Sequence, residues 1–470
     1  MKKMFKLMAV LLVLALALMA CAPAAPVEEA PAEEEVMEEE APAEEVMEEE
    51  AGNPNDCWMH MQGSFVTGFF SDDIRADLDN QLGVFIMPGI DETLPFALEV
   101  GGDQYVVFDG KARPEVKKFM EFLATGASAD PWITVGGSLF PHQDQDTSLY
   151  PTMIETNMAE AILTAEAARF DGSDGMDQAV NNAFWKGITD WVSGATIDEA
   201  LAAIDENLPE VAAGEAAGGA VAASTEVLED TGTVFVMGAF RGEEENAFTN
   251  VIAVFEEQNP DIDVIYAGSA EFEALLPIRV EAGDPPDIAA LPQPGTMKSF
   301  AADGLLEPLW PELVTLYDTN YTAAWKELGS YEGTPYGLFH RVNAKGWVWY
   351  NKPRFEAAGY TAPATWDEFE ALMADMATTD TAPLCVGIES GAATGWYGTD
   401  WVENLLLRTS PVDVYDQWVN HTLPFSSPEV KAAWEIMDDV WFQKGYAYGG
   451  PPTVGTTNFK DAALGLFIAE

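Results

Sequence analysis

Apolar positions recur with two alternating periods along residues 233–291, and they predict strands and helices in turn. Thr233–Ala239 is a run of apolar and β-branched residues that is typical of a strand. Glu243–Gln258 then places its apolar residues at helical spacing. A strand over Asp261–Tyr266, a helix over Phe272–Ala282 and a short buried strand over Asp287–Leu291 follow. Strands that alternate with helices favour a parallel sheet covered on both faces.

Two low-complexity stretches divide the chain. Residues 22–56 largely repeat Ala-Pro-Ala-Glu-Glu and Val-Met-Glu-Glu-Glu, with little apolar surface to bury. Like charges and proline predict an extended acidic tether there, with a helical stalk as the alternative. Residues 209–230 are rich in Ala, Gly and Glu and predict a linker. We call residues 57–208 the first segment and residues 231–470 the second segment.

The start of the chain has the pattern of an export signal. Lys2, Lys3 and Lys6 precede an uncharged apolar run, Leu7 to Ala20, which is short for a membrane span. The run ends in Leu-Met-Ala-Cys at residues 18–21, which resembles a bacterial lipobox. We therefore expect a signal peptide over residues 1–21 and lipidation at Cys21, with acyl chains that anchor the protein in a membrane. The alternative is an ordinary signal peptide that ends at a chance cysteine.

Charge and length limit the partners and the architecture. The chain has 470 residues and a net charge of −57. Beyond residue 56 there are 19 basic and 65 acidic residues, a net charge of −46. Such a surface repels nucleic acid and anionic lipid, so neither is an expected partner. A chain this long is expected to form at least two lobes.

No catalytic pattern stands out. The four histidines, at positions 60, 142, 340 and 421, lie far apart in sequence, and none has the spacing of a metal site. Neither a nucleophile elbow nor a phosphate-binding loop is present. We expect no enzyme activity, no cofactor and no metal. A glycoside hydrolase stays open as a weaker alternative, because so many acidic residues make carboxylate pairs inevitable.

The second segment resembles the N-terminal half of the extracellular solute-binding proteins of ABC sugar importers, most closely the α-glucoside and maltose group. The motifs that carry the resemblance are Gly238–Glu244, Gly283–Ile288, Gln293–Gly295, Tyr350–Lys352 and Gly387–Gly391 continuing to Trp401. The first segment resembles the C-terminal half of the same family through Cys57–Phe65, Gly83–Gly89, Gly101–Asp103, Arg113–Glu115 and Ala183–Trp185.

The two halves therefore stand in swapped order, as in a circular permutation. The linker of about 22 residues has a reach of roughly 25 Å, sufficient to join the family's usual ends. A scrambled gene model or assembly, and halves drawn from adjacent tandem copies, remain open.

The resemblance implies an α/β fold of the type II periplasmic-binding class. Each of its two lobes would have a mixed or parallel sheet flanked by helices, with a ligand cleft between them that closes by hinge motion. One lobe would take about 232–342 with 101–148, and the other about 343–470, 53–100 and 150–208. The resemblance also implies a disulfide between Cys57 and Cys385, with two separate buried thiols as the alternative.

The resemblance further implies capture of a sugar, expected to be an α-linked di- or oligosaccharide, and its delivery to the permease of an ABC importer. We expect a monomer held at the cell surface or in the periplasm. A surface sugar-binding or sensing lipoprotein with no transport role is the alternative.

Ten residues are expected to bind the ligand. Aromatic rings pack on the apolar faces of sugars, and planar polar groups bind their hydroxyls. Arg241, Glu244 and Gln293 follow predicted strands, where α/β folds bind ligands. For Lys345, near the crossover between lobes, hinge and ligand roles both stay open. The remaining six come from their places in the family motifs: Trp396, Tyr397, Asp400, Trp185, Gln62 and Ser64.

Overall fold

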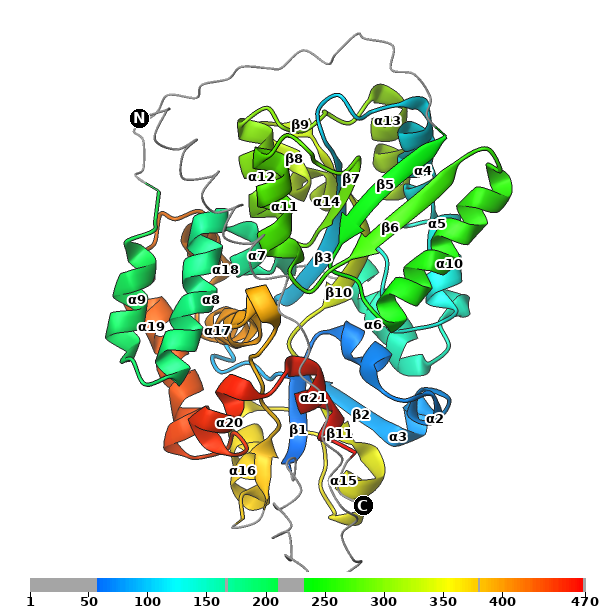
Figure 1. The fold of residues 1–470 in the computed structure, drawn as a ribbon. Helices are drawn as coiled ribbons and strands as arrows, with labels where there is room; N and C mark the ends of the chain where they lie inside the picture. Colours follow the sequence, from blue (N-terminus) through cyan, green and yellow to red (C-terminus); the bar gives the residue numbers. More distant parts are fainter. Residues whose placement is uncertain (1–56, 165–167, 210–231, 379–380, 468–470) are drawn as a thin grey trace, which may run out of the picture. The chain divides into compact units, whose positions relative to one another are not determined.

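The computed structural model describes residues 57–164, 168–209, 232–378 and 381–467 (Figure 1). All of them belong to one compact unit of the chain, Gly52–Glu470. The predicted signal peptide, the lipidation site at Cys21, the acidic tether and nearly all of the linker lie outside the described residues. None of the helices in the described ranges combines the length and the apolar character that a membrane span requires.

The larger sheet has six strands. Five follow the order β10-β3-β7-β5-β6, and β4 pairs with β3 outside this path. The bounds are β3 (Leu98–Val107), β4 (Ala168–Phe170), β5 (Thr233–Gly238), β6 (Asp263–Gly268), β7 (Ile288–Leu291) and β10 (Gly337–Ala344). β5 runs parallel to β6 and β7, whereas β3 runs antiparallel to β7 and β10. The strands predicted over residues 233–291 are therefore parallel to one another, as expected, and the sheet as a whole is mixed.

Helices cover both faces of the larger sheet. α10 (Glu243–Gln258) has the bounds that the sequence predicts, and it shares one core with α4 (Pro114–Leu123) and α5 (Gly126–Ile133). α11 (Phe272–Glu281) and α12 (Pro294–Ala302) pack on the other face. Alternate residues of β5 enter these two cores because successive side chains of a strand point to opposite faces.

The smaller sheet has four strands in the order β12-β1-β11-β2. Their bounds are β1 (Cys57–Gln62), β2 (Leu82–Ile86), β11 (Trp347–Asn351) and β12 (Ala382–Leu384). β11 is antiparallel to both β1 and β2, and β12 is parallel to β1. Two mixed sheets with flanking helices confirm the predicted α/β class.

A second core joins the smaller sheet to a group of long helices that is rich in tryptophan. Four of these helices are α8 (Gln178–Val192), α9 (Ile197–Asp205), α17 (Trp396–Thr409) and α19 (Pro428–Asp438). α9 begins at a capping box formed by Thr196 and Glu199, a device that stabilises a helix by about 1 kcal/mol.

The remaining elements are short helices, two short strands and the helices at the margins of the sheets. They are η1 (Ser64–Phe69), α2 (Asp72–Arg75), α3 (Leu78–Gln81), η2 (Thr147–Leu149), α6 (Met153–Thr164), α7 (Gly172–Gly175), α13 (Pro311–Asn320), α14 (Ala323–Leu328), β8 (Ser330–Tyr331), β9 (Thr334–Pro335), α15 (Lys352–Ala357), α16 (Trp366–Met376), η3 (Gly391–Ala393), α18 (Val412–Val419), η4 (Asp439–Gln443), α20 (Gly450–Thr456) and α21 (Phe459–Leu464).

Both segments of the chain contribute strands to both sheets. The smaller sheet takes β1 and β2 from the first segment and β11 and β12 from the second. The larger sheet takes β3 and β4 from the first segment and its other four strands from the second. β4 pairs with Leu98–Val100 of β3, which we expected in the same lobe as β4. The two segments therefore interlock in one unit.

A disulfide joins Cys57 of β1 to Cys385, which follows β12, and confirms the predicted pairing. The two Cα atoms are 5.3 Å apart although 328 residues separate them in sequence. The backbone N–H of Cys385 also donates a hydrogen bond to the carbonyl oxygen of Met59 at 2.8 Å. The bridge therefore reinforces the pairing of β1 with β12 and links the two segments covalently.

The end of the second segment lies close to the start of the first. The side-chain amide of Asn351 donates to the carbonyl oxygen of Leu466 at 3.2 Å. Three residues further on, Arg354 donates to the carbonyl oxygen of Cys57 at 2.8 Å. One short stretch at the start of α15 therefore binds the backbone of both Leu466 and Cys57.

Candidate functional site

A cavity of about 180 Å³ lies where loops of the larger sheet meet helices of the smaller sheet's core. Ala239, Ser269 and Pro292 line it directly after β5, β6 and β7. The carboxyl ends of these three parallel strands therefore open into the cavity, as in other α/β folds. The opposite wall comes from η1, α7, α8, α17 and α21.

Aromatic rings form one part of the cavity wall. The ring centroid of Trp396 lies 5.0 Å from that of Phe459 and 6.0 Å from that of Phe65. Phe69 continues the group, with its centroid 5.6 Å from that of Phe459. Trp185 adds a further ring from α8. Such rings offer the flat apolar surface on which the C–H face of a sugar packs.

Gly395 allows the two tryptophans to share the cavity. Its φ of 114° lies in the left-handed region, which favours glycine. A Cβ atom at this position would lie 2.2 Å from the carbonyl oxygen of Trp185. The loop before α17 therefore approaches α8 more closely than any other residue type would permit, and Trp396 begins its helix beside Trp185.

Arg341 organises the polar wall. Its guanidinium bonds to Asp103 at 3.1 Å, to Glu244 at 2.7 Å and to Ser138 at 2.8 Å. Burial raises the pKa of Asp103 to about 6, although Arg341 lowers it. Burial lowers the pKa of Arg341, but Glu244 and Asp103 outweigh this effect and raise it. The ring of Phe240 lies 5.3 Å from the guanidinium carbon.

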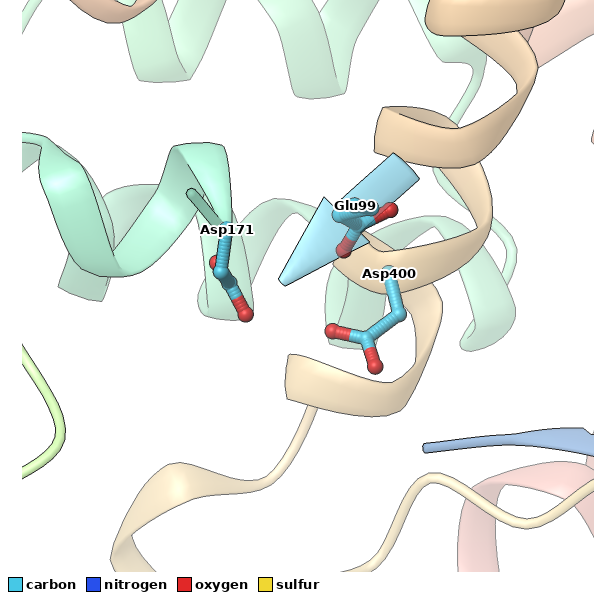
Figure 2. A group of neighbouring side chains, drawn as sticks. All are labelled: Glu99, Asp171 and Asp400. Atoms are coloured by element: carbon cyan, nitrogen blue, oxygen red, sulfur yellow. The ribbon is translucent and has the colours of Figure 1, made fainter. Parts of the chain in front are cut away.

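A second ion cluster lies at the base of the cavity around Lys345. Figure 2 shows the carboxylates of Glu99, Asp171 and Asp400 close together, from β3, the start of α7 and α17. The ammonium of Lys345 pairs with Asp171 and, at 2.8 Å, with Asp400. Burial opposes a charged lysine, but Asp171 and Asp400 hold its pKa well above the usual value.

The two carboxylates that share this ammonium differ in pKa. Burial opposes ionisation of Asp171, yet Lys345 lowers its pKa below the usual value. Burial raises the pKa of Asp400 to about 7, although Lys345 lowers it. The ammonium of Lys345 is therefore balanced mainly by the ionised carboxylate of Asp171.

The same three carboxylates are of a residue type that binds cations. One oxygen atom from each lies within 4.8 Å of the other two. The ammonium of Lys345 already supplies positive charge to two of them. The third, Glu99, accepts a hydrogen bond from Asn404, and burial raises its pKa well above the usual value. The cluster therefore fits an internal ion pair better than a metal site.

A deeper layer holds the start of α7 in place. One carboxylate oxygen of Glu403 accepts the backbone N–H of Gly172 at 2.5 Å, and the other accepts that of Ser173 at 3.2 Å. The hydroxyl of Tyr415 donates to the same carboxylate at 3.2 Å. Asp171 and Asp174 are thereby fixed at the cavity wall.

Two further carboxylates at the cavity form no salt bridge among the described residues. Asp174 receives only a long hydrogen bond of 3.5 Å from Asn181, and burial raises its pKa well above the usual value. Burial also raises the pKa of Glu273 to about 7. Both groups can accept hydrogen bonds from a ligand.

The structure brings six of the ten expected ligand residues to the cavity: Trp396, Trp185, Arg241, Glu244, Gln293 and Lys345. The other four lie behind its wall. Tyr397 is fully buried and stacks on His60, with ring centroids 5.3 Å apart. Asp400 is buried beneath Lys345. Gln62 is buried and accepts the N–H of Gly63, and Ser64 accepts the N–H of Ala344 at 3.2 Å.

Several cavity residues were not predicted as ligand residues: Phe65, Phe69, Asp103, Asp171, Asp174, Glu273, Arg341, Phe459 and Lys460. A sequence signal existed for Asp171 and Asp174, because they stand in a glycine-punctuated loop, Asp-Gly-Ser-Asp-Gly, before a helix. Asp103 follows the Gly-Gly pair that carries the family resemblance.

Residues 241–467 match the family described as bacterial extracellular solute-binding protein. The chain is 42% identical over 240 residues to the osmoprotective compounds-binding protein GgtB of Synechocystis, a match that covers 51% of this chain and 57% of that protein. It is 40% identical over 244 residues to the alpha-glucosides-binding periplasmic protein AglE of Rhizobium meliloti, covering 50% of this chain and 53% of that protein. The chain thus spans about half the length of the curated relatives it matches, both of which are named as binding proteins.

The solved structure of the bacterial solute receptor AcbH, which is described as having an exclusive preference for β-D-galactopyranose, is also similar. It shares 19% identity at a TM-score of 0.33, and the match covers 50% of this chain and 58% of that chain.

Proposed function

Because residues 241–467 match the family of bacterial extracellular solute-binding proteins, we propose that the whole chain captures a sugar outside the cytoplasm and delivers it to an ABC importer. The proposal covers the complete interlocked unit, because the cavity is lined by both segments. The chain acts by binding and release, without chemical change of the ligand.

One observation carries this proposal, namely that a single cavity combines a group of aromatic rings with hydrogen-bonding groups. Trp396 and Phe459 supply rings, while Gln293 and Arg241 supply planar donors. Arg341 already pairs with Asp103 and Glu244. Burial raises the pKa values of the unpaired Asp174 and Glu273, which favours their neutral forms. A neutral, polyhydroxylated ligand suits such a cavity better than an ion does.

We propose an α-linked glucoside as the ligand. AglE is named for binding alpha-glucosides and GgtB for binding osmoprotective compounds, and their identities to this chain are 40% and 42%. A neutral glucoside satisfies both the aromatic and the hydroxyl-binding parts of the cavity.

The test is titration calorimetry of the full chain against maltose, trehalose and sucrose, with glutamate and a tripeptide as non-sugar ligands. We expect one of the sugars to bind and Trp396→Ala to weaken that binding at least 10-fold, about 1.4 kcal/mol. Trp366→Ala is the matched control, because Trp366 is a half-buried tryptophan on α16 outside the cavity. Binding of the peptide or the amino acid, with none to any sugar, refutes the proposal.

We propose that acylation at Cys21 anchors the protein at the outer side of a membrane, and that the acidic stretch 22–56 links the anchor to the folded unit. The support is the lipobox-like sequence before Cys21. Expression in a bacterial host with radiolabelled palmitate tests the anchor. Label should enter the wild type and be absent from Cys21→Ser, which should then be recovered in the soluble fraction.

We also propose that the swapped order of the segments is a circular permutation of the family fold. Two observations support this proposal: each sheet contains strands of both segments, and Leu466 and Cys57 bind side chains only three residues apart. The family's usual chain would then run on from the neighbourhood of Leu466 into β1.

A further inference from the structure

The base of the cavity is almost closed to solvent. Asp103, Trp185, Arg341 and Lys345 all line the cavity, and each is only 5% exposed. Asp103 and Arg341 come from strands of the larger sheet, whereas Trp185 comes from α8 on the opposite wall. A sugar reaches these groups only if the two walls move apart, so the structure describes a closed cavity. Contacts that hold the walls together therefore affect how long a ligand stays bound.

Charged residues of opposite sign face each other across the cavity mouth, the more exposed rim of the two walls. The first turn of α10, on the larger-sheet wall, carries Glu243, Glu244 and Glu245. Lys460 of α21, on the opposite wall, places its ammonium 3.7 Å from the carboxylate of Glu244. Arg75 of α2 places its guanidinium 3.7 Å from the carboxylate of Glu243. Figure 1 shows α10 beside the larger sheet and both α2 and α21 beside the smaller one.

The Lys460–Glu244 pair is positioned from both walls. The ammonium of Lys460 lies 4.7 Å from the ring centroid of Phe69 and 5.7 Å from that of Phe459, and both rings belong to its own wall. On the other wall, Arg341 holds one carboxylate oxygen of Glu244, and the second oxygen faces Lys460. Each partner is thereby oriented by its own wall, which lowers the side-chain entropy that the pair loses when the walls meet.

A third pair of opposite charges adds a longer-range attraction with the reverse polarity. Arg241 lines the cavity on the larger-sheet wall, and Glu389 follows β12 on the opposite wall. Hydrogen bonds from the backbone of Gly391 and the amide of Asn458 lower the pKa of Glu389, burial raises it, and Arg241 lowers it further. The charge of Arg241 is therefore felt across the cavity.

The placement of the basic residues is informative because they are scarce. Beyond residue 56 there are 19 basic and 65 acidic residues. Two walls with such an excess of negative charge repel each other as they approach. Arg75 and Lys460 lie where the walls meet, so they replace part of this repulsion with attraction at the cavity mouth.

We propose that the pairs Lys460–Glu244 and Arg75–Glu243 form an electrostatic latch that holds the cavity closed over a bound ligand. The inference rests on the proposed sugar-binding function and goes further, because it assigns the residues that position the two walls rather than those that recognise the sugar. The apparent affinity for a ligand falls with the fraction of molecules in the binding-competent state. Weakening the latch should therefore weaken sugar binding without removing any hydroxyl-binding group.

The salt dependence of sugar binding tests the latch, because an uncharged sugar forms no ion pair of its own. Titration calorimetry of the full chain measures the affinity for the tightest of maltose, trehalose and sucrose. The two salt conditions are about 0.01 M and 1 M NaCl, between which the screening length falls from about 30 Å to 3 Å. We expect the wild-type dissociation constant to rise about 3- to 10-fold, since two partly exposed pairs are screened.

A double variant removes both cations of the latch. Arg75→Gln/Lys460→Gln should bind the sugar about 3- to 10-fold more weakly than the wild type at low salt. At high salt it should bind no more weakly than at low salt, because screening then reduces only the repulsion between the acidic walls. Lys431→Gln is the matched control: Lys431 of α19 pairs with Asp198 and Glu435 within one wall, so its loss should leave affinity and salt dependence unchanged.

A charge exchange tests the latch at residues that do not line the cavity, namely Arg75 and Glu243. Glu243→Arg places a second cation opposite Arg75 and should weaken sugar binding at low salt. Adding Arg75→Glu restores opposite charges and should recover the affinity. A role of Glu243 in folding alone would give no such recovery.

The outcomes separate this inference from the proposed function. A wild type whose sugar affinity does not fall with salt overturns the latch alone. The same fall with salt in Arg75→Gln/Lys460→Gln, or no recovery in the charge exchange, also overturns it alone. Absence of binding to every sugar at both salt concentrations refutes the proposed function, and this inference falls with it.

Discussion

Cys57 is bonded to Cys385 across 328 residues of sequence, and the bridge lies where β1 meets the end of β12. Both cysteines are almost completely buried. The bond constrains the unfolded chain over a very long loop, which is the situation in which such a bond is expected to stabilise a protein most.

We predict that the double variant Cys57→Ser/Cys385→Ser lowers the free energy of unfolding by about 2–4 kcal/mol. Guanidinium unfolding followed by tryptophan fluorescence measures the change. Dithiothreitol should destabilise the wild type by a similar amount and leave the double variant unaffected. A wild type whose midpoint ignores dithiothreitol would contradict the structural role of the bridge.

Lys345→Met should destabilise the protein strongly, by about 3–5 kcal/mol, because it leaves Asp171 and Asp400 buried without their cation. Adding Asp171→Asn and Asp400→Asn to that variant should recover part of the loss. Lys186→Met is the matched control: Lys186 pairs with Asp190 on an exposed surface, so its loss should cost less than about 1 kcal/mol. Equal effects of the two lysine substitutions would mean that the buried cluster does not depend on Lys345.

Glu273 should make stability fall with rising pH. Burial raises the pKa of Glu273 from its ordinary value of 4.5 to about 7 in the folded protein, so the folded state binds more protons between these two pH values. The contribution is fully present below about pH 4.5 and is lost as the pH rises through 7.

We therefore expect the free energy of unfolding of the wild type, relative to Glu273→Gln, to fall by about 1–3 kcal/mol between pH 4 and pH 8. Urea unfolding of both proteins across this range measures the difference, and comparison with the variant cancels the other titrating groups. A relative stability that rises with pH would place the carboxylate in a charge-stabilising environment instead.

A chain rearranged to run from residue 232 to 467 and then from 57 to 209 should fold into the same unit. The expectation follows from the closeness of Leu466 and Cys57, whose carbonyl oxygens are bound by Asn351 and Arg354. A short Gly-Ser connector would join the new junction. Circular dichroism should show the same cooperative unfolding, and sugar affinity should stay within about twofold of the wild type. Failure of the rearranged chain to fold cooperatively would argue against a permuted family fold.

Local elements were largely predictable from the sequence, because they depend on nearby residues. The helix Glu243–Gln258 is found with the bounds that its apolar spacing predicts. Gln293 was found through its place after a buried strand, since the position where a parallel strand ends determines where its loop points.

The sequence did not predict which of two neighbouring residues in a motif faces the cavity. Trp396 and Tyr397 are neighbours, but one step along a helix turns a side chain by about 100°. Trp396 therefore faces the cavity, whereas Tyr397 enters the core beside His60. A single sequence gives the motif but not the rotation of its helix about the axis.

Ion pairs between residues far apart in the sequence could not be predicted either. Arg341 and Asp103 stand directly opposite each other on β10 and β3, a register that includes an irregularity between Phe339 and Arg341. Nothing local to either strand specifies this register, because it depends on how two stretches 238 residues apart meet.

The sharing of both sheets by the two segments has a consequence for proteolysis. Cleavage of any peptide bond between residues 210 and 231 would leave two polypeptides, one holding β1 to β4 and the other β5 to β12. Each sheet would still need strands from both pieces, and the Cys57–Cys385 bond would still join them. The nicked protein should therefore persist as a two-chain molecule that migrates as one band until a reductant is added.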